Sequence, residues 1–119
     1  MTEVCMLSDK SCAPCQGIGE AMELSVAQGM MVQLADGWVL ADDGKSLTRE
    51  YRFKGFAKAV YMANTAAFLA DQQGHHPDVS FGWGYCRVLF TSHELGGLSE
   101  NDFICAAKLD QMVAVTARA

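Results

Sequence analysis

The segment from Phe56 to about Gln73 limits most what this chain can fold into, because it is the longest stretch with one clear periodicity. Small and apolar side chains recur there at intervals of four and three residues: Phe56, Val60, Ala63, Ala67 and Ala70. This spacing predicts a helix with one apolar stripe, whose alanines allow close packing against a sheet. Gly74 is suited to a left-handed helix cap, and Pro77 disfavours helical geometry at the residue before it.

Two predicted strand pairs flank this helix. Before it, residues 38–40 and 46–53 are separated by an Asp-Asp-Gly turn, which is typical of a hairpin. After it, residues 79–83 and 86–92 form the second pair, and the glycines on either side of Trp83 indicate a bulge. Alternation in the last strand places four side chains on one face: Cys86, Val88, Phe90 and Ser92.

Two further helices complete the expected order. A short one is predicted over residues 16–28, ending at Gly29, from apolar side chains at helical spacing: Ile18, Met22 and Val26. Ser99 can cap the last helix, with Asp102 three residues on as in a capping box. The order αββαββα predicts a two-layer α+β fold, in which three helices cover one face of a four-stranded antiparallel sheet.

A chain of 119 residues is long enough for one domain with a substantial core. We expect a loosely attached, cysteine-containing arm over residues 1–15 and a single domain over residues 16–119. The net charge of −5 argues against direct binding of nucleic acid or of an anionic membrane surface. No apolar run reaches the ~18 residues of a membrane span, and the start lacks a secretory pattern. We therefore expect a soluble, cytoplasmic protein.

The five cysteines fit a reducing compartment better than a disulfide framework, because their number is odd. Cys86 and Cys105 lie in apolar stretches and are expected in the core. The motif Cys12-Ala-Pro-Cys15 has zinc-ligand spacing, which His75 and His76 could complete. Adjacent histidines rarely point at one ion, and the motif does not open a helix after a strand as a thioredoxin-like site would. We expect no metal and no organic cofactor.

The three histidines, His75, His76 and His93, fall within a window of 19 residues. Two follow a predicted helix end and one ends a strand, so their loops can converge into a site. Imidazoles suit proton transfer near neutral pH. The helix end favours a protonated imidazole at His75 or His76, but repulsion opposes charging both, so we predict one protonated near pH 7. The alternative is that they are ordinary surface histidines of the loops, or partners for exposed carbonyl groups. No local signature supports a serine or cysteine nucleophile.

The histidines belong to a longer pattern with a defined spacing: Asp71, His75-His76-Pro77, Trp83, His93 and Asp102. This spacing resembles the signature of the pterin-4a-carbinolamine dehydratase family. The strings GHHPD, TSHELGGLSENDF and AAKLD, and Phe-Lys-Gly-Phe-Ala at the start of the middle helix, are also similar to it. The resemblance covers about Trp38 to Met112. Val79 departs from the family, which often has a larger side chain there, and this departure bears on the shape of a pocket.

The resemblance implies an enzyme that eliminates water from 4a-hydroxytetrahydropterin to give quinonoid dihydropterin. This hydro-lyase step, 4a-hydroxytetrahydrobiopterin dehydration, recycles the pterin cofactor of aromatic amino acid hydroxylases. It needs an acid for the leaving hydroxyl and a base for the proton on N5, and imidazoles supply both. By the resemblance, His75 and His93 are proton donors toward the two faces of the substrate, and His76 mainly holds the pterin.

The resemblance also implies supporting roles. Asp71 orients a histidine or binds the polar edge of the pterin, unless it is only a solvated residue of the helix. Trp83 supplies an apolar wall, or packs in the core. Pro77 sets the backbone that aims the histidine pair. Asp102 either supports the site or only stabilises the start of its helix, and the second interpretation is favoured.

Proteins with this fold also act as binding proteins, including a dimerisation partner of a transcription factor and proteins like assembly factors. The alternative function is therefore a non-catalytic dimerisation or interaction module. The three histidines and Asp71 argue against it, because a scaffold has no chemical need for them. Exposed sheet edges are usually paired, and the family pairs them between subunits. The resemblance thus implies a homodimer, which a helical face could extend to a tetramer.

Overall fold

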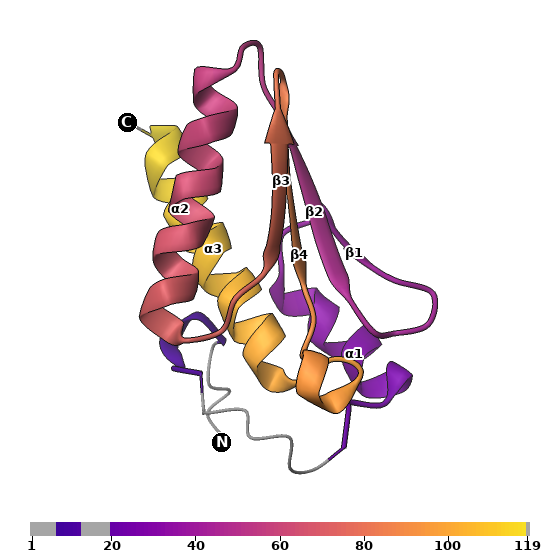
Figure 1. The fold of residues 1–119 in the computed structure, drawn as a ribbon. Helices are drawn as coiled ribbons and strands as arrows, with labels where there is room; N and C mark the ends of the chain where they lie inside the picture. Colours follow the sequence, from indigo (N-terminus) through magenta and orange to yellow (C-terminus); the bar gives the residue numbers. More distant parts are fainter. Residues whose placement is uncertain (1–6, 13–19, 119) are drawn as a thin grey trace.

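The structure is a computed structural model and describes residues 7–12 and 20–118 (Figure 1). In chain order its elements are η1 (Leu7–Asp9), α1 (Leu24–Met30), η2 (Met31–Gln33), β1 (Trp38–Leu40), β2 (Leu47–Arg52), α2 (Ala57–Gln73), β3 (Asp78–Gly82), β4 (Tyr85–Phe90), η3 (His93–Leu95) and α3 (Glu100–Arg118). The strands form one antiparallel sheet in the order β1-β2-β4-β3. Together with the three α-helices this makes the predicted α+β fold.

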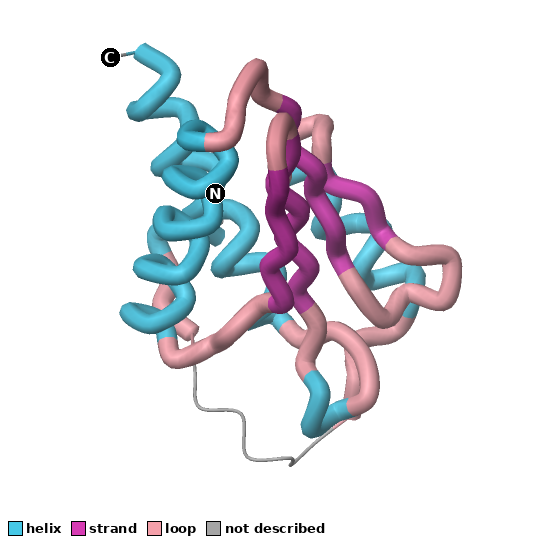
Figure 2. Tube along the Cα trace, turned by 45° about the horizontal axis from the view of Figure 1, so that its top comes forward, coloured by secondary structure: helices cyan, strands magenta, loops and turns pink. Residues whose placement is uncertain are grey.

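The sheet buries one face and leaves the other open to solvent. Leu47 lies opposite Phe90 and Tyr51 opposite Cys86 in the pairing of β2 with β4, and all four side chains are buried. In Figures 1 and 2, α2 and α3 run along the same side of this sheet. The other face carries side chains that are exposed or half-exposed: Val39, Thr48, Glu50, Arg52 and Arg87. Within the described residues no helix is both long and apolar enough to cross a bilayer.

The β3–β4 hairpin confirms the predicted strands but not the predicted bulge. The pairing continues without interruption to Gly82 opposite Tyr85, so only Trp83 and Gly84 form the turn. Gly84 has φ +86°, a conformation that glycine adopts without the steric cost of a side chain. Trp83 therefore lies at the tip of a hairpin, with 72% of its surface exposed. Its interpretation as a core residue is wrong.

Helix α2 has nearly the predicted bounds, but its buried face is rotated from the predicted stripe. The buried side chains are Ala59, Met62, Ala63, Ala66, Leu69 and Ala70. Phe56 precedes the helix and is 52% exposed, and Ala67 is also exposed. The prediction failed because α2 has apolar side chains on more than one side, including the exposed Tyr61 and Phe68. Contact with the sheet and α3 selects which side is buried.

The first helix differs most from its prediction. It begins at Leu24, continues past Gly29 to Met30 and leads directly into η2. The backbone N–H of Met22 donates to the carbonyl of Leu98 at 2.7 Å, and this long-range bond holds residues before Leu24 outside the helix. Val26 is 51% exposed, whereas Ala27 is fully buried. Residues 16–19 of the predicted helix lie outside the described residues.

Residues 7–12 pack against α3 and are not loosely attached as we expected. Leu7 is 2% exposed and belongs to the hydrophobic core. The Lys108 ammonium donates to the Ser8 carbonyl at 2.9 Å, and Lys10 pairs with Glu100 at 2.6 Å. These contacts join the start of the chain to the last helix. The division into an arm over residues 1–15 and a domain over residues 16–119 stays a prediction.

Candidate active site

His75 and Asp102 form a buried pair between the end of α2 and the first turn of α3. Gly74 ends α2 at φ +66°, as predicted, and the N–H of His75 donates to the Ala70 carbonyl. This cap turns the chain so that Nε2 of His75 lies 2.5 Å from Oδ1 of Asp102. His75 is 9% exposed and Asp102 is fully buried. The imidazole also stacks on Phe90 of β4, with ring centroids 6.3 Å apart.

The second oxygen of Asp102 is held by two serines. Oδ2 accepts from the Ser92 hydroxyl at 2.7 Å and from the Ser99 backbone N–H at 3.0 Å. The two serine hydroxyls lie 2.7 Å apart. A buried carboxyl group needs such partners, because water no longer reaches it. The segments after α2 and after β4 therefore converge on the start of α3, at the lower end of the molecule in Figure 1.

The pair with Asp102 changes the proton affinity of His75. The hydrogen bond to Asp102 raises the pKa of His75 above its usual value, although burial acts in the opposite direction. The charges of Asp102, Cys12 and Glu94 raise this pKa further. The direction of this shift favours the protonated imidazole, and its largest cause is the hydrogen bond to a carboxylate of another helix.

We expect this pair to make the stability of the protein depend on pH. Since the folded state raises the pKa of His75, its stabilisation is complete below the unfolded pKa of about 6.5 and is lost as pH rises through the folded pKa. A tenfold difference in proton affinity between the folded and unfolded states corresponds to about 1.4 kcal/mol. Urea unfolding of the wild type and His75→Gln between about pH 5.5 and 8.5 measures the effect. The wild type should lose more stability than the variant over this range.

The lowered pKa of Cys12 acts in the opposite direction, because it adds stability as pH rises toward the usual thiol pKa. Cys12 is present in both proteins, but the charge of His75 lowers its pKa, so the difference between their pH profiles reports His75 together with this coupling. If the free energy of unfolding of the two proteins changed with pH in parallel, the raised pKa of His75 in the pair with Asp102 would be contradicted.

The other two predicted histidines neighbour this network along the chain. His76 and His93 are exposed, and each directly follows one of its members along the chain, His75 or Ser92. Pro77 is half-buried between His76 and β3. His76 therefore lies in the loop after α2 and His93 at the start of η3, in the two segments that converge at Asp102.

The structure does not bring Trp83 to the histidines of the same chain. The five residues of β3 lie between the His75 loop and the β3–β4 turn, and a strand of that length spans about 16 Å. In Figure 1 this turn stands at the end of the sheet opposite to η3. Trp83 therefore forms no wall for a ligand held at His75 of its own chain.

Sequence reasoning missed part of the network. One of the two roles expected for Asp71, one turn before His75, was to orient a histidine, but Asp71 is exposed and Asp102 is the partner of His75. Ser92 and Ser99 were predicted only as a strand residue and a helix cap. Two signals pointed to them: the capping-box spacing from Ser99 to Asp102, and the polar Ser92 at the end of the otherwise apolar face of the alternating residues 86–92.

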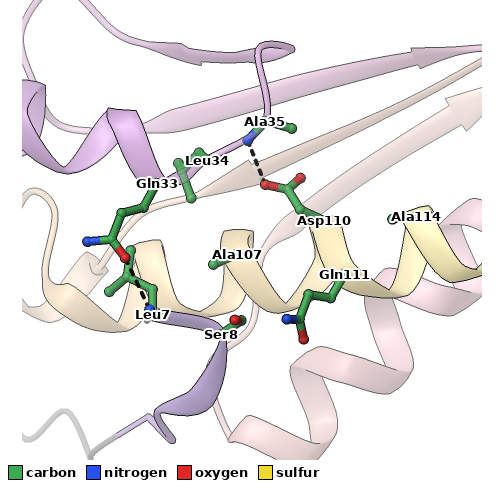
Figure 3. A pocket seen from close by; sticks show the side chains of 9 residues that line it. All are labelled: Leu7, Ser8, Gln33, Leu34, Ala35, Ala107, Asp110, Gln111 and Ala114. Carbon is green, nitrogen blue, oxygen red and sulfur yellow. Dashed lines mark hydrogen bonds between the residues drawn. The ribbon is translucent and has the colours of Figure 1, made fainter. Parts of the chain in front are cut away.

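A cavity of about 390 Å³ lies elsewhere, between η1, η2 and α3 (Figure 3). Its lining residues are Leu7, Ser8, Gln33, Leu34, Ala35, Ala107, Asp110, Gln111 and Ala114. Asp110 accepts from the Ala35 N–H, the Trp38 indole and the Arg49 guanidinium at 2.7 to 2.8 Å. These bonds join α3 to the first hairpin, so Asp110 has a structural role. The cavity contains none of the histidines.

Comparison with known proteins identifies the chain's relatives. The sequence profile of the family described as Pterin 4 alpha carbinolamine dehydratase matches residues 21–112. A protein of Nitrosomonas eutropha is 42% identical over 113 residues, which cover 95% of this chain and 98% of the relative. One of Methylococcus capsulatus is 42% identical over 112 residues, which cover 94% and 97%. Both relatives are provisionally named pterin-4-alpha-carbinolamine dehydratases.

Two solved structures are similar to this fold. A transcriptional coactivator/pterin dehydratase from Brucella melitensis aligns with a TM-score of 0.70 and 27% identity, covering 78% of this chain and 98% of that one. A pterin dehydratase-like protein described as a RuBisCO assembly factor in the α-carboxysome aligns with a TM-score of 0.53 and 22% identity, covering 64% and 88%. The second likeness shows the fold alone. The profile match contains all three histidines and Asp102, and the chain belongs to the pterin 4 alpha carbinolamine dehydratase family.

Proposed function

We propose that this protein is a cytoplasmic dehydratase that eliminates water from 4a-hydroxytetrahydropterin and so recycles the cofactor of aromatic amino acid hydroxylases. The observation that carries the proposal is the buried His75–Asp102 pair in a chain of this family. A carboxylate that raises the pKa of an imidazole favours its protonated form, and this form can donate a proton to a leaving group. The elimination needs such a donor.

In the proposed reaction the proton of His75 goes to the departing 4a-hydroxyl, and the C4a–O bond breaks as water leaves. The electron pair of the N5–H bond forms the C4a–N5 double bond of quinonoid dihydropterin, and a base takes the N5 proton. Asp102 engages Nε2 of His75, which leaves Nδ1 as the ring nitrogen for the substrate. The two serines on Asp102 keep the carboxyl group, and through it the imidazole, in one orientation.

His76 and His93 complete the proposed site. Both are exposed, so a pterin arriving from solvent can reach them. His93 is the second proton donor, toward the other face of the substrate, and His76 mainly holds the pterin. Pro77 restricts the backbone after His76. Asp71 is exposed and can meet the polar edge of the pterin.

The direct experiment measures the loss of freshly generated 4a-hydroxytetrahydropterin with and without the protein. The compound also dehydrates spontaneously, so the protein-free rate is the baseline. We expect a rate proportional to protein concentration and well above that baseline. A rate equal to the baseline, from protein shown to be folded, would contradict the proposal and favour the interaction module.

We also propose that the protein forms a homodimer. β1 and β3 are the edge strands of the sheet, and such edges are usually paired or protected. Near one edge, Phe81 of β3 is 43% exposed and lies against the exposed Phe56, with ring centroids 6.1 Å apart. Tyr61 and Phe68 of α2 are 65% and 59% exposed, a helical face suited to a tetramer. Light scattering that gives a monomer mass at micromolar concentration would contradict this.

A further inference from the structure

We propose that Cys12 and Cys105 are a modification site, a dithiol that hydrogen peroxide converts to a disulfide. The two residues are 93 positions apart in sequence, yet their Sγ atoms lie 3.4 Å apart. Forming the bond requires the sulfurs to approach to roughly 2.05 Å, which is a small movement for one side chain of a surface segment. This proposal does not rest on the proposed reaction with pterins.

Backbone and side-chain contacts hold Cys12 in place. Its N–H donates to Oε1 of Gln73, the last residue of α2, at 2.9 Å. Its Sγ also lies 3.6 Å from the carbonyl oxygen of Asn101 in the first turn of α3. The thiol therefore lies where α2 ends and α3 begins, in contact with Cys105. The two sulfurs are already adjacent in the folded protein, so no rearrangement of the backbone is needed to bring them together.

The two thiols have unequal surroundings. Cys12 is half-buried, and Cys105 is fully buried. The hydrogen bond from Cys105 lowers the pKa of Cys12, against the effect of burial, and the nearby charge of His75 lowers it further. The same hydrogen bond and burial raise the pKa of Cys105. Peroxide-sensitive cysteines are typically accessible, of low pKa and next to a second thiol. Cys12 is the attacking thiolate, and Cys105 is the resolving thiol.

The oxidation proceeds in two balanced steps. The Cys12 thiolate attacks one oxygen of hydrogen peroxide, the O–O bond breaks, and hydroxide leaves and takes a proton to become water. Cys12 is then a sulfenic acid. The Cys105 sulfur attacks the Cys12 sulfur, the S–O bond breaks, and the Cys105 proton leaves with the hydroxide as a second water. Two thiols lose two electrons in total, and one peroxide is reduced to two waters.

The experiment treats the reduced full-length protein with a few equivalents of hydrogen peroxide at pH 7. Remaining thiols are alkylated, and a digest without reductant is analysed by mass spectrometry. We expect a peptide pair joined through Cys12 and Cys105 that dithiothreitol separates. Cys86 is the internal control, because it is buried in β4 and burial raises its pKa. We expect Cys86 to be alkylated at least tenfold more slowly than Cys12 before oxidation.

Variants separate this pair from the other cysteines. Cys12→Ser changes a half-buried side chain and should fold, and it should abolish the linked peptide. Cys15→Ser should retain the link. Cys105→Ser keeps a hydrogen-bond donor beside Cys12 and should leave a sulfenic acid on Cys12 that dimedone traps. The Cys12→Ser result stands even if that variant unfolds. Free Cys12 and Cys105 after the same dose, or a Cys12–Cys15 link in their place, would overturn the proposal. These readouts do not use dehydratase activity, so the two proposals fail separately.

Discussion

Replacement of His75 by glutamine is expected to lower kcat/KM for dehydration of 4a-hydroxytetrahydropterin by about 10²- to 10⁴-fold at pH 7, the usual contribution of one acid–base group. The glutamine amide can still donate a hydrogen bond to Asp102, but it cannot give a proton to the departing hydroxyl. The variant can therefore keep the hydrogen bond to Asp102, which spans 2.5 Å in the wild type, but it loses the proton transfer to the substrate. The initial rate above the spontaneous dehydration is the measurement.

His76→Gln is the matched control for this prediction. It makes the same chemical change at the next residue, on an exposed side chain. If His76 mainly holds the pterin, its variant raises KM more than it lowers kcat. Circular dichroism and thermal unfolding verify that both variants fold. A folded His75→Gln protein with the activity of the wild type would exclude His75 as the proton donor.

Removal of the Asp102 carboxyl group should have the largest effect on stability. The Asp102→Ala variant leaves the His75 imidazole, the Ser92 hydroxyl and the Ser99 N–H without their acceptor. Breaking a buried ion pair on one side typically costs about 3–5 kcal/mol. This is a large part of the roughly 5–15 kcal/mol by which a domain is stable. Urea unfolding near pH 6, where His75 is protonated, measures the loss.

Glu100→Ala provides the control in the same turn of α3. Glu100 is acidic and close to the helix start like Asp102, but it forms its ion pair with Lys10 at the surface. Exposed pairs contribute about 0–1 kcal/mol, so this variant should stay close to the wild type. Asp102→Asn keeps an acceptor for the serines but loses the charge, and its pH profile should resemble that of His75→Gln. Equal losses in Asp102→Ala and Glu100→Ala would show that the buried network contributes little.

Proteins of similar fold are described in other roles, so the fold does not by itself assign the activity. One similar structure is described as a coactivator/pterin dehydratase and another as a RuBisCO assembly factor. The proposed dehydratase activity rests on the buried His75–Asp102 pair, and variants of this pair test it against the interaction module. Functional variants should therefore be directed first at this pair.

Local patterns in the sequence predicted most of the elements. The alternation of residues 86–92 identified β4 and its buried face, and the Gly74 cap identified the end of α2. Where local signals were weak or ambiguous, the predictions were wrong. The helix predicted from residue 16 begins at Leu24, because the bond between Met22 and Leu98 competes with helix formation. The buried side of α2 also depends on its neighbours in space.

The order of helices and strands, the buried face of the sheet and the family all follow from the amino-acid sequence, because they depend on periodicity, turn residues and motif spacing. The pairing of His75 with Asp102 and the contact of Cys12 with Cys105 come from tertiary packing alone. Packing also separated Trp83 from the histidines and placed Leu7 in the core. Such contacts join residues far apart in the chain, and they arise when helices and sheet come together to bury apolar surface. That packing leaves no periodic trace in the segments it brings together.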